Sequence, residues 1–498
     1  MTARPVDLSS ETLRQRLNRR VRLAVPGIQA AIFALSLLQV GCTADADGVR
    51  GLPATPAIVL EDVTVVDGDG TPPRPKMSVV ITQGKVAQVA PTNAVEIRRG
   101  WEVRRLPGRF VLPGLIDTHA HVTFLRDPDN FAGYDRATSE RILKILLAHG
   151  ITTVLNPAAP DAAGVELRDA VATGHVLGPR MLTAGRPINW GADRDPEDVR
   201  AEVKRQVSVG VDCIKVYARM PPHLIRAAAE AAHTHSLRVV GHLDATSPEQ
   251  AVAAGIDAIT HAATWTPGLL RPERRENYLK RRREVGNMRA RIDWLAWLDL
   301  NGPEIQRSIQ AVARTRTPLD PTLIAYVAKF QGRDPRYLNS PYLRMAPQEV
   351  LDTWQNALSY LTDEDFKRGA IVWPRLLELV KRYYDAGALL ATGSDFPNPL
   401  VIPGASLHDE MELLVQAGIS PAEVIRIATR NGAEALRLLA ETGTVAVGKR
   451  ADLVVLDADP TTDIANIRRI EKVFLGGQEY SPRDLLRQAQ VGAVPGLR

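Results

Sequence analysis

The middle of the chain alternates between short apolar runs and longer stretches with helical periodicity. The short runs are Leu112–Thr118, Thr152–Leu155, Arg180–Thr183, Cys213–Tyr217, Val239–Leu243, Ala258–His261, Pro318–Leu323 and Leu389–Ser394. Helical stretches such as Ser139–His149, Pro196–Val209, Pro222–His235 and Pro248–Ala254 lie between them. Strands that alternate with helices in this way favour a parallel sheet that closes on itself. We therefore predict an α/β fold, a (β/α)₈ TIM-type barrel, over residues 111–439.

Short β-rich runs also occur towards both ends of the chain. They are Ala57–Leu60, Val63–Val66, Ser78–Ile81 and Val86–Val89 on one side, and Ala451–Leu456 and Ile470–Leu475 on the other. Asp-Gly, Pro-Pro and Gln-Gly turn signals separate the first set. Two β-rich fragments around one long α/β region predict a composite β-sandwich domain formed by residues 57–110 and 440–482.

The first 42 residues have the pattern of an export signal. Several arginines precede a mostly apolar stretch, Val25–Gly41, which is shorter than the roughly 20 residues of a membrane span. Leu37–Cys42 resembles a bacterial lipoprotein box, although Gln39 stands where a leucine is expected, and Ala44–Ala46 offers a competing cleavage site. We predict a leader over 1–42 and a linker over 43–56. The protein is then exported to the bacterial cell envelope, either periplasmic or lipid-anchored at Cys42; a disordered tail on a cytoplasmic protein is the alternative.

Two segments carry the positive charge behind the formal net charge of +5. One is the leader, and the other is an Arg-rich run within residues 265–299, which follow the sixth predicted strand as an insertion in the barrel. Because this charge is not spread over one face of the fold, we expect no nucleic-acid partner. The insertion also contains Trp265, Trp294 and Trp297. Three interpretations remain open for it: a lid over the barrel mouth, a contact in a homo-oligomer, and a solvated basic helix.

Chemically active side chains stand on, or directly after, five of the predicted strands. They are His119, His121, Lys215, His242, His261 and Asp395. In a (β/α)₈ barrel the carboxyl ends of the strands meet at one mouth, where the chemistry takes place. His119 and His121 are two residues apart on an extended segment, so their imidazoles face the same side. Imidazole and carboxylate ligands suit Zn²⁺ and similar ions, and the set therefore predicts a metal site.

Three segments of the sequence resemble the amidohydrolase superfamily. They are Val111–His121, which is similar to the family's first-strand signature, Gly393–Asp395, which is similar to its last-strand motif, and Gly443–Val454, which is similar to its closing β segment. The resemblance implies the barrel and the composite β domain. It also implies that His119, His121 and Asp395 bind a deeper metal ion, and that His242 and His261 bind a second one.

Lys215 lies in Cys213–Tyr217, a segment that resembles the prolidase-like and imidazolonepropionase-like branch of the superfamily. The resemblance implies that this lysine is carboxylated (N6-carboxylysine) and bridges two divalent ions, with Zn²⁺ as the expected metal. Carboxylation makes chemical sense, because a free ammonium repels two dications and has no lone pair to donate. A lysine paired with a carboxylate of the barrel is the structural alternative.

The resemblance implies hydrolysis of carbon–nitrogen bonds in small substrates such as dipeptides or N-acyl amino acids, of the Xaa-Pro-dipeptidase or carboxypeptidase kind. A metal-activated hydroxide attacks the amide carbonyl, and Asp395 acts as the proton shuttle. Tyr217 shares a strand face with Lys215 and is a candidate oxyanion donor or, equally, a packed barrel tyrosine. Arg219 is a candidate partner for a substrate carboxylate. His408 is a candidate residue of the barrel mouth or a helix cap.

Two other functions remain open. A mononuclear cyclic-amide hydrolase or deaminase, of the imidazolonepropionase kind, does not need the lysine of the fourth strand, so Lys215 weighs against it. A metal-binding lipoprotein without turnover is less consistent with the full set of ligands and Asp395.

Overall fold

The computed structural model describes residues 56–124, 133–491 and 497 of the chain. The predicted leader, its Cys42 and most of the predicted linker lie outside the described residues. The described residues all belong to one compact unit, Ala54–Arg498. Within the described part of the chain, no helix combines the length and the apolar character needed to cross a bilayer.

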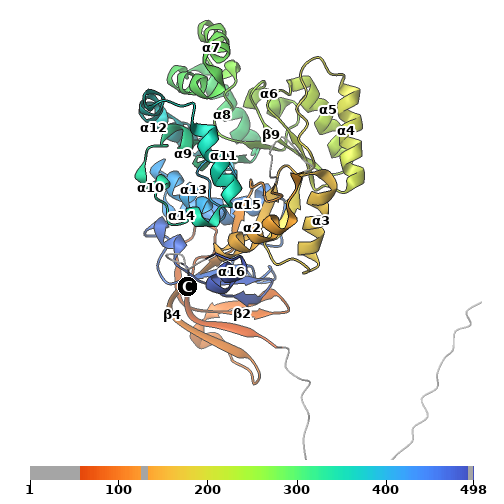
Figure 1. Cartoon of the computed structure of the whole chain (residues 1–498). Coiled ribbons are helices and arrows are strands. Elements are labelled where there is room, and N and C mark those ends of the chain that lie inside the picture. The colour runs from red at the N-terminus through yellow and green to blue at the C-terminus, as the bar shows by residue number, and fades with distance from the viewer. Residues whose placement is uncertain (1–55, 125–132, 492–496, 498) are drawn as a thin grey trace, which may run out of the picture. The chain divides into compact units, whose positions relative to one another are not determined.

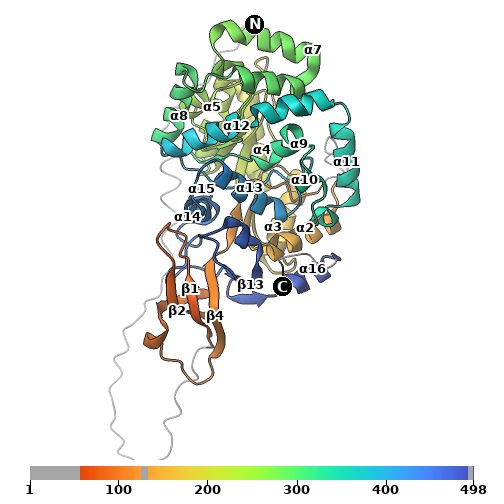
Figure 2. The same cartoon turned by 90° about the vertical axis from the view of Figure 1, so that its left-hand side faces the viewer.

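A seven-stranded sheet contains strands from both ends of the chain (Figure 1). Its order is β14 (Gln478–Tyr480), β13 (Ile470–Leu475), β12 (Leu453–Leu456), β4 (Glu102–Pro113), β1 (Ile58–Val65), β2 (Arg74–Thr82) and β3 (Lys85–Pro91). Strand β12 pairs antiparallel with β4, with Val455 opposite Val111. The β-rich fragments that the sequence separates by more than three hundred residues therefore join in one sheet, and Figure 2 shows β1, β2 and β4 side by side.

The two faces of β4 and β12 pack against different cores. Val111, Leu453 and Val455 belong to the apolar cluster of the seven-stranded sheet. Leu112 and Val454 belong to the large core beneath the helices. Because side chains alternate along a strand, this pair of strands holds the sheet and the α/β region together.

The α/β region contains two parallel sheets. One has the order β5 (Leu115–Asp117), β6 (Ile151–Asn156) and β7 (Arg180–Thr183). The other has the order β11 (Leu319–Asp320), β10 (Ala258–Thr260), β9 (Arg238–His242) and β8 (Cys213–Val216). Single bridges join Ala184 to Cys213 and Ile188 to Val216, between β7 and β8. The predicted α/β class is confirmed.

The last predicted strand, Leu389–Ser394, forms only single bridges, at Leu390 to Leu319 and nearby at Phe396 to Ala120. Around the first bridge, the N–H of Leu319 donates to the carbonyl of Leu389 and the N–H of Ala391 donates to the carbonyl of Leu319, both at 3.0 Å. Side chains add further bonds. The Thr392 hydroxyl donates to the carbonyl of Ile116 at 2.9 Å. The Asn431 amide donates to the carbonyl of Leu390 at 3.0 Å. The two parallel sheets are therefore connected through this segment without forming one continuous ladder.

Helices follow most of the strands. They are α2 (Arg136–Ala148), α3 (Asp161–Ala172), α4 (Pro196–Val209), α5 (Pro222–His233), α6 (Pro248–Ala253), α7 (Pro272–Trp297), α8 (Pro303–Thr315), α9 (Ile324–Phe330), α10 (Pro335–Leu338), α11 (Gln348–Leu358), α12 (Asp363–Asp385), α13 (Ala405–Gln416), α14 (Pro421–Arg426), α15 (Gly432–Ala435) and α16 (Pro482–Gln488). Helices α4 to α8 each begin with proline, which suits the first turn because its missing N–H is not needed there. The predicted span Pro196–Val209 matches α4.

The insertion 265–299 contains α7, which is interrupted at Gly286 (φ 79°, ψ 165°). The part before Gly286 carries most of the exposed basic residues. The part after it buries Ala290, Ile292 and Trp294, and Arg289 forms an ion pair with Asp365 of α12 at 2.8 Å. A solvated basic helix therefore describes only the first half of α7, because the second half packs into the fold.

We expect Gly114→Ala to destabilise the protein. A Cβ atom at this position, between β4 and β5, would lie 2.0 Å from Thr152 Oγ1 and 2.3 Å from its Cγ2. Overpacking of this kind costs about 1–3 kcal/mol, and the midpoint of thermal unfolding should fall. Gly268→Ala is the matched control, because its Cβ would meet no atom closer than 3.5 Å and neither glycine has a positive φ. Equal midpoints for the two variants would contradict the packing argument.

Candidate functional site

A cavity of about 540 Å³ opens at the carboxyl ends of the parallel strands. Seven of the residues singled out in the sequence line it: His119, His121, Lys215, Tyr217, His242, His261 and Asp395. The strand order explains the convergence. Lys215 lies on β8, His242 ends β9, and His261 directly follows β10. The structure thus brings together the whole set of predicted metal ligands, which the sequence spreads over nearly three hundred residues.

The tightest group consists of His119, His121 and Asp395. Asp395 Oδ1 lies 3.2 Å from Nε2 of His119 and 3.2 Å from Nε2 of His121. One ligand atom from each residue lies within 4.8 Å of the others, a spacing that suits a single ion. Two imidazole nitrogens and a carboxylate oxygen are ligands that Zn²⁺ prefers. The residues present therefore fit a divalent metal ion.

A second group contains His119, His261 and Asp320, whose ligand atoms also lie within 4.8 Å of one another. His261 Nε2 is 3.8 Å from Asp395 Oδ2, so this group adjoins the first. His242 stands beside it, with its ring centroid 4.6 Å from that of His261. The Nε2 atom of His242 is 3.5 Å from Asp244 Oδ1, and His242 belongs to neither close group.

Lys215 is buried, with only 1% of its surface exposed, at the bottom of this cavity. Its Nζ donates to the hydroxyl of Thr260 at 3.1 Å. Among the described residues no carboxylate lies within 4.0 Å of its ammonium, so the ion-pair alternative expected from the sequence has no partner at that distance. Burial lowers the pKa of Lys215 to about 8.

The site attracts positive charge. Burial lowers the pKa of His119, but the carboxylates of Asp395 and Asp320 outweigh this effect and raise it to about 9. Although burial opposes ionisation of Asp395, His119 and His121 hold the pKa of its carboxyl well below its usual range. Burial lowers the pKa of His121, His242 and His261, so these imidazoles stay neutral and keep a lone pair. An ionised carboxylate beside neutral imidazoles is an electrostatic setting that suits a metal cation.

Backbone geometry at the strand ends is unusual. His261, Thr322 and Asp395 have φ values of 69°, 45° and 56°. Non-glycine residues rarely adopt this left-handed region, and they tend to do so at functional sites. Two of the three residues are predicted ligands, and Thr322 contacts His261 Nδ1 through its hydroxyl at 2.5 Å.

Asp320 is a site residue that the sequence analysis did not single out. It ends β11, is buried, and places Oδ1 3.2 Å from Nδ1 of His119. When the imidazole is neutral, donation from Nδ1 to Asp320 leaves the lone pair of Nε2 available to a metal ion. The sequence did contain a signal, because Asp320 lies inside the predicted strand Pro318–Leu323. A carboxylate buried in a strand needs a partner, which indicates a site residue.

Two predicted substrate-binding residues do not line this cavity. His408 is fully buried in the first turns of α13, and its Nε2 bonds to the carbonyl oxygen of His149 at 2.9 Å. Arg219 is exposed, and its backbone N–H donates to Asn189 Oδ1 at 3.0 Å. Both residues lie near site residues in the sequence, but neither side chain lines the cavity.

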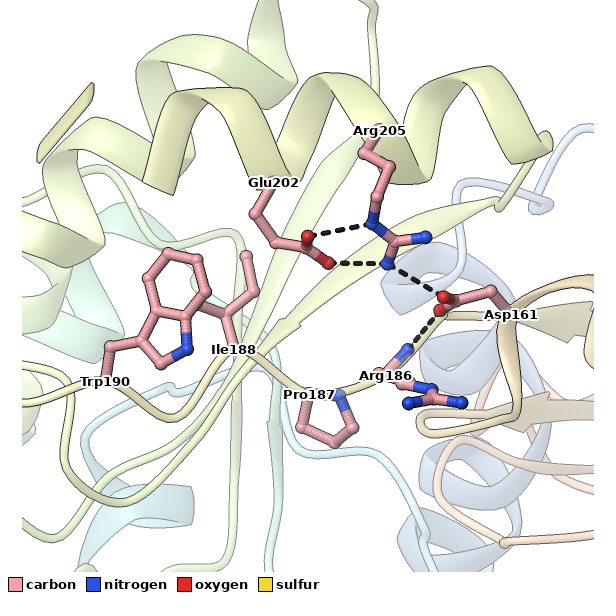
Figure 3. Close-up of a pocket in the computed structure, with 7 residues that line it drawn as sticks. All are labelled: Asp161, Arg186, Pro187, Ile188, Trp190, Glu202 and Arg205. Atoms are coloured by element: carbon pink, nitrogen blue, oxygen red, sulfur yellow. Dashed lines mark hydrogen bonds and ion pairs between the residues drawn. The ribbon is translucent and has the colours of Figure 1, made fainter. Parts of the chain in front are cut away.

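A second hollow, of about 500 Å³, lies beside α3 and α4 (Figure 3). Its charged side chains are already paired with one another. Arg205 lies 2.7 Å from Asp161 and 2.6 Å from Glu202. The backbone N–H of Arg186 donates to Asp161 at 2.7 Å. Because its lining residues include no histidine, this hollow offers no metal-binding chemistry of the kind present at the strand ends.

The chain is similar to known proteins of one family. The model of the amidohydrolase family matches residues 110–266 and 377–480. The imidazolonepropionase of Salmonella agona (strain SL483) is 42% identical over 89 residues, which are 18% of this chain and 21% of that protein. The match thus spans about a fifth of the length of this curated relative.

Solved structures match over a much larger part of the chain. A prolidase-like protein from Bifidobacterium longum is 25% identical, with a TM-score of 0.62, over 88% of this chain and 100% of that chain. A prolidase complexed with N-methylphosphonate-L-proline is 21% identical, with a TM-score of 0.64, over 85% of this chain and 99% of that chain. The second likeness shows a shared fold.

We expect Asp320→Asn to weaken metal binding by about 10- to 100-fold, since removal of a carboxylate that orients a ligating imidazole typically has this effect. The affinity can be measured by competition with a chromogenic chelator. Asp363→Asn is the control, because the Asp363 side chain is 78% exposed and pairs only with Arg333 on the surface. Unchanged affinity in the Asp320 variant would exclude the orienting role.

Proposed function

The chain belongs to the amidohydrolase family, and on this basis we propose that it is a metal-dependent hydrolase of amide or peptide bonds in small substrates such as dipeptides or N-acyl amino acids. The observation that carries the proposal is the convergence of His119, His121 and Asp395 in one cavity. The prolidase-like solved structures, which match over most of the chain, support the substrate class.

We propose a binuclear site that contains Zn²⁺. His119, His121 and Asp395 would bind one ion, and His242 and His261 would bind the other. Divalent ions bound there supply a water of lowered pKa and polarise the carbonyl oxygen of the substrate.

Lys215 would be carboxylated and would bridge the two ions. The neutral amine is the form that adds carbon dioxide: a nitrogen–carbon bond forms and the nitrogen loses a proton. Burial lowers the pKa of Lys215 to about 8, so a substantial fraction of the amine is neutral in mildly alkaline solution. The absence of a carboxylate partner among the described residues also favours this modification over a permanent ion pair.

Asp395 would move the proton during hydrolysis. Its carboxylate is ionised and faces the histidine cluster, so it can accept a proton from the attacking water and deliver it to the leaving nitrogen. Tyr217 forms part of the cavity wall, with its ring 4.5 Å from that of His242. Although Tyr217 is 38% exposed, partial removal of its ring from water raises its pKa to about 12. Its hydroxyl therefore stays protonated and can donate to a developing oxyanion.

We also propose that the two parallel sheets act as one closed (β/α)₈ barrel, and that residues 57–110 and 440–482 form the composite β-sandwich domain. We further propose that the protein is exported to the cell envelope. The bridges at Ala184, Leu390 and Phe396 support closure. The shared seven-stranded sheet supports the composite domain. The pattern of residues 1–42 supports export.

A mononuclear cyclic-amide hydrolase or deaminase is the second candidate. The position of His242 favours it, because Nε2 of this histidine faces Asp244 and lies outside both close ligand groups. The local likeness to an imidazolonepropionase is consistent with it. A measured content of one metal ion per chain, together with hydrolysis of cyclic amides, would favour this alternative.

The proposed function predicts that the zinc-loaded protein hydrolyses members of a library of Xaa-Pro dipeptides and N-acyl amino acids. Asp395→Asn should lower kcat by about 10²- to 10⁴-fold, as expected for loss of a general acid–base group. Asp363→Asn on the surface should retain the rate. Absence of hydrolysis throughout the library, or a near-wild-type rate in the Asp395 variant at saturating metal, would contradict the proposal.

A further inference from the structure

Two basic side chains that the sequence analysis did not assign, Arg291 and Lys329, line the catalytic cavity. Arg291 comes from the second half of α7, and therefore from the insertion 265–299. Lys329 comes from α9. Neither belongs to the strand ends that carry the metal-ligand set, so both are available for another task in the same cavity.

The charge of Arg291 is only partly balanced. Its side chain is 15% exposed, and Nη2 lies 3.7 Å from Asp244 Oδ2, beyond ordinary hydrogen-bond distance. Asp244 is also 3.5 Å from His242, so its carboxylate serves two groups. The Arg291 guanidinium also makes a weak contact, at 3.8 Å, with the sulfur of Met288 on the same helix.

The charge of Lys329 has still less compensation. Its Nζ lies 5.3 Å from the ring centroid of Tyr326, and among the described residues no carboxylate lies within 4.0 Å of it. Burial and, second, the nearby guanidinium of Arg291 lower the pKa of Lys329 to about 7. Because the Arg291 guanidinium disfavours the charged form of Lys329, an anion bound beside both side chains would stabilise that charged form.

Both cations rest on a rigid aromatic base. The Arg291 guanidinium lies over the ring of Trp265 at 5.3 Å. The Nε1–H of Trp265 donates to the hydroxyl of Tyr326 at 3.2 Å, and the two ring centroids are 5.2 Å apart. Trp265 and Tyr326 are almost fully buried. Side chains held in this way lose little conformational freedom on binding a ligand, which favours affinity.

We propose that Arg291 and Lys329 form an anion subsite that binds the free carboxylate of the substrate. This inference rests on the proposed function and deepens it: the substrates are N-acyl amino acids or dipeptides with an unblocked C-terminus. A cavity of about 540 Å³ is in the range of small-ligand sites, and such sites commonly combine apolar walls with a few polar anchors. The insertion 265–299 then contributes to substrate specificity. Arg291, and not the predicted Arg219, is the partner of the substrate carboxylate.

The test compares L-proline with L-prolinamide, which differ at the carboxylate and have no N-acyl bond to cleave. Binding of each to the zinc-loaded full chain is measured by calorimetry, and kcat and KM are measured for dipeptides from the library together with their C-terminal amides. The variants are Arg291→Gln and Lys329→Met. Arg283→Gln is the matched control, since Arg283 is an exposed arginine on the same helix.

We expect the wild-type protein and the Arg283 variant to bind the acid on the order of 10- to 100-fold more tightly than the amide, as hydrogen bonds to charged groups would provide. Arg291→Gln and Lys329→Met should remove most of this preference by raising KM for acids and leaving KM for amides nearly constant. If Arg291 and Lys329 had only a structural role, the substitutions would weaken binding of the acid and of the amide equally. Equal binding of acid and amide by the wild-type protein would overturn the anion subsite.

The two proposals fail separately. If the acid binds more tightly than the amide and no dipeptide or N-acyl amino acid is hydrolysed, the anion subsite stands and the proposed function is wrong. If dipeptides and their amides are hydrolysed with equal kcat/KM, the proposed function stands and the anion subsite is wrong.

Discussion

The carboxylate of Asp395, shared between the imidazoles of His119 and His121, is the interaction on which the rest of the site depends. It joins the first parallel strand to the last segment of the α/β region, because Asp395 follows the bridged segment and His119 follows β5. The backbone closes the same gap, since the N–H of Asp395 donates to the carbonyl of His119 at 2.6 Å. Gly393 allows this approach: a Cβ there would lie 2.8 Å from that of His119. A metal ion would replace the proton that these groups attract, and would hold the same elements together.

The seven-stranded sheet supports this region through a short covalent connection. Strand β4 leads through Gly114 into β5, and the first ligand follows a few residues later. The N–H of Gly114 donates to the carbonyl of Asp452 at 2.8 Å, next to β12. The C-terminal part of the chain therefore fixes the strand that presents His119 and His121. This explains in physical terms why residues far from the cavity in sequence matter to its geometry.

The sequence could predict the ligand set because strands impose simple rules. Residues two apart face one side, and parallel strands end at one edge, so His119, His121, His242 and His261 could be placed before any coordinates were known. No such rule fixes the direction of a side chain on a loop or a helix. Arg219 and His408 were for that reason assigned to substrate binding although neither lines the cavity, and Arg291 and Lys329 were overlooked. Arg291 and Lys329 reach the cavity because of how α7 and α9 pack, and the direction of α7 changes at Gly286. The segment Leu389–Ser394 makes backbone bonds to Leu319 and Thr118 but forms only isolated bridges, and Thr392 and Asn431 add side-chain bonds to it.

The central claim is that these side chains form a two-metal centre that Lys215 completes. The most direct measurement is the zinc content per chain of protein reconstituted with Zn²⁺ in bicarbonate buffer, by elemental analysis, for the wild type and for Lys215→Ala. A carboxylate-bridged centre should hold about two ions per chain in the wild type, and one or fewer in the variant. A wild-type protein that holds a single ion, with the same content after Lys215→Ala, would contradict it.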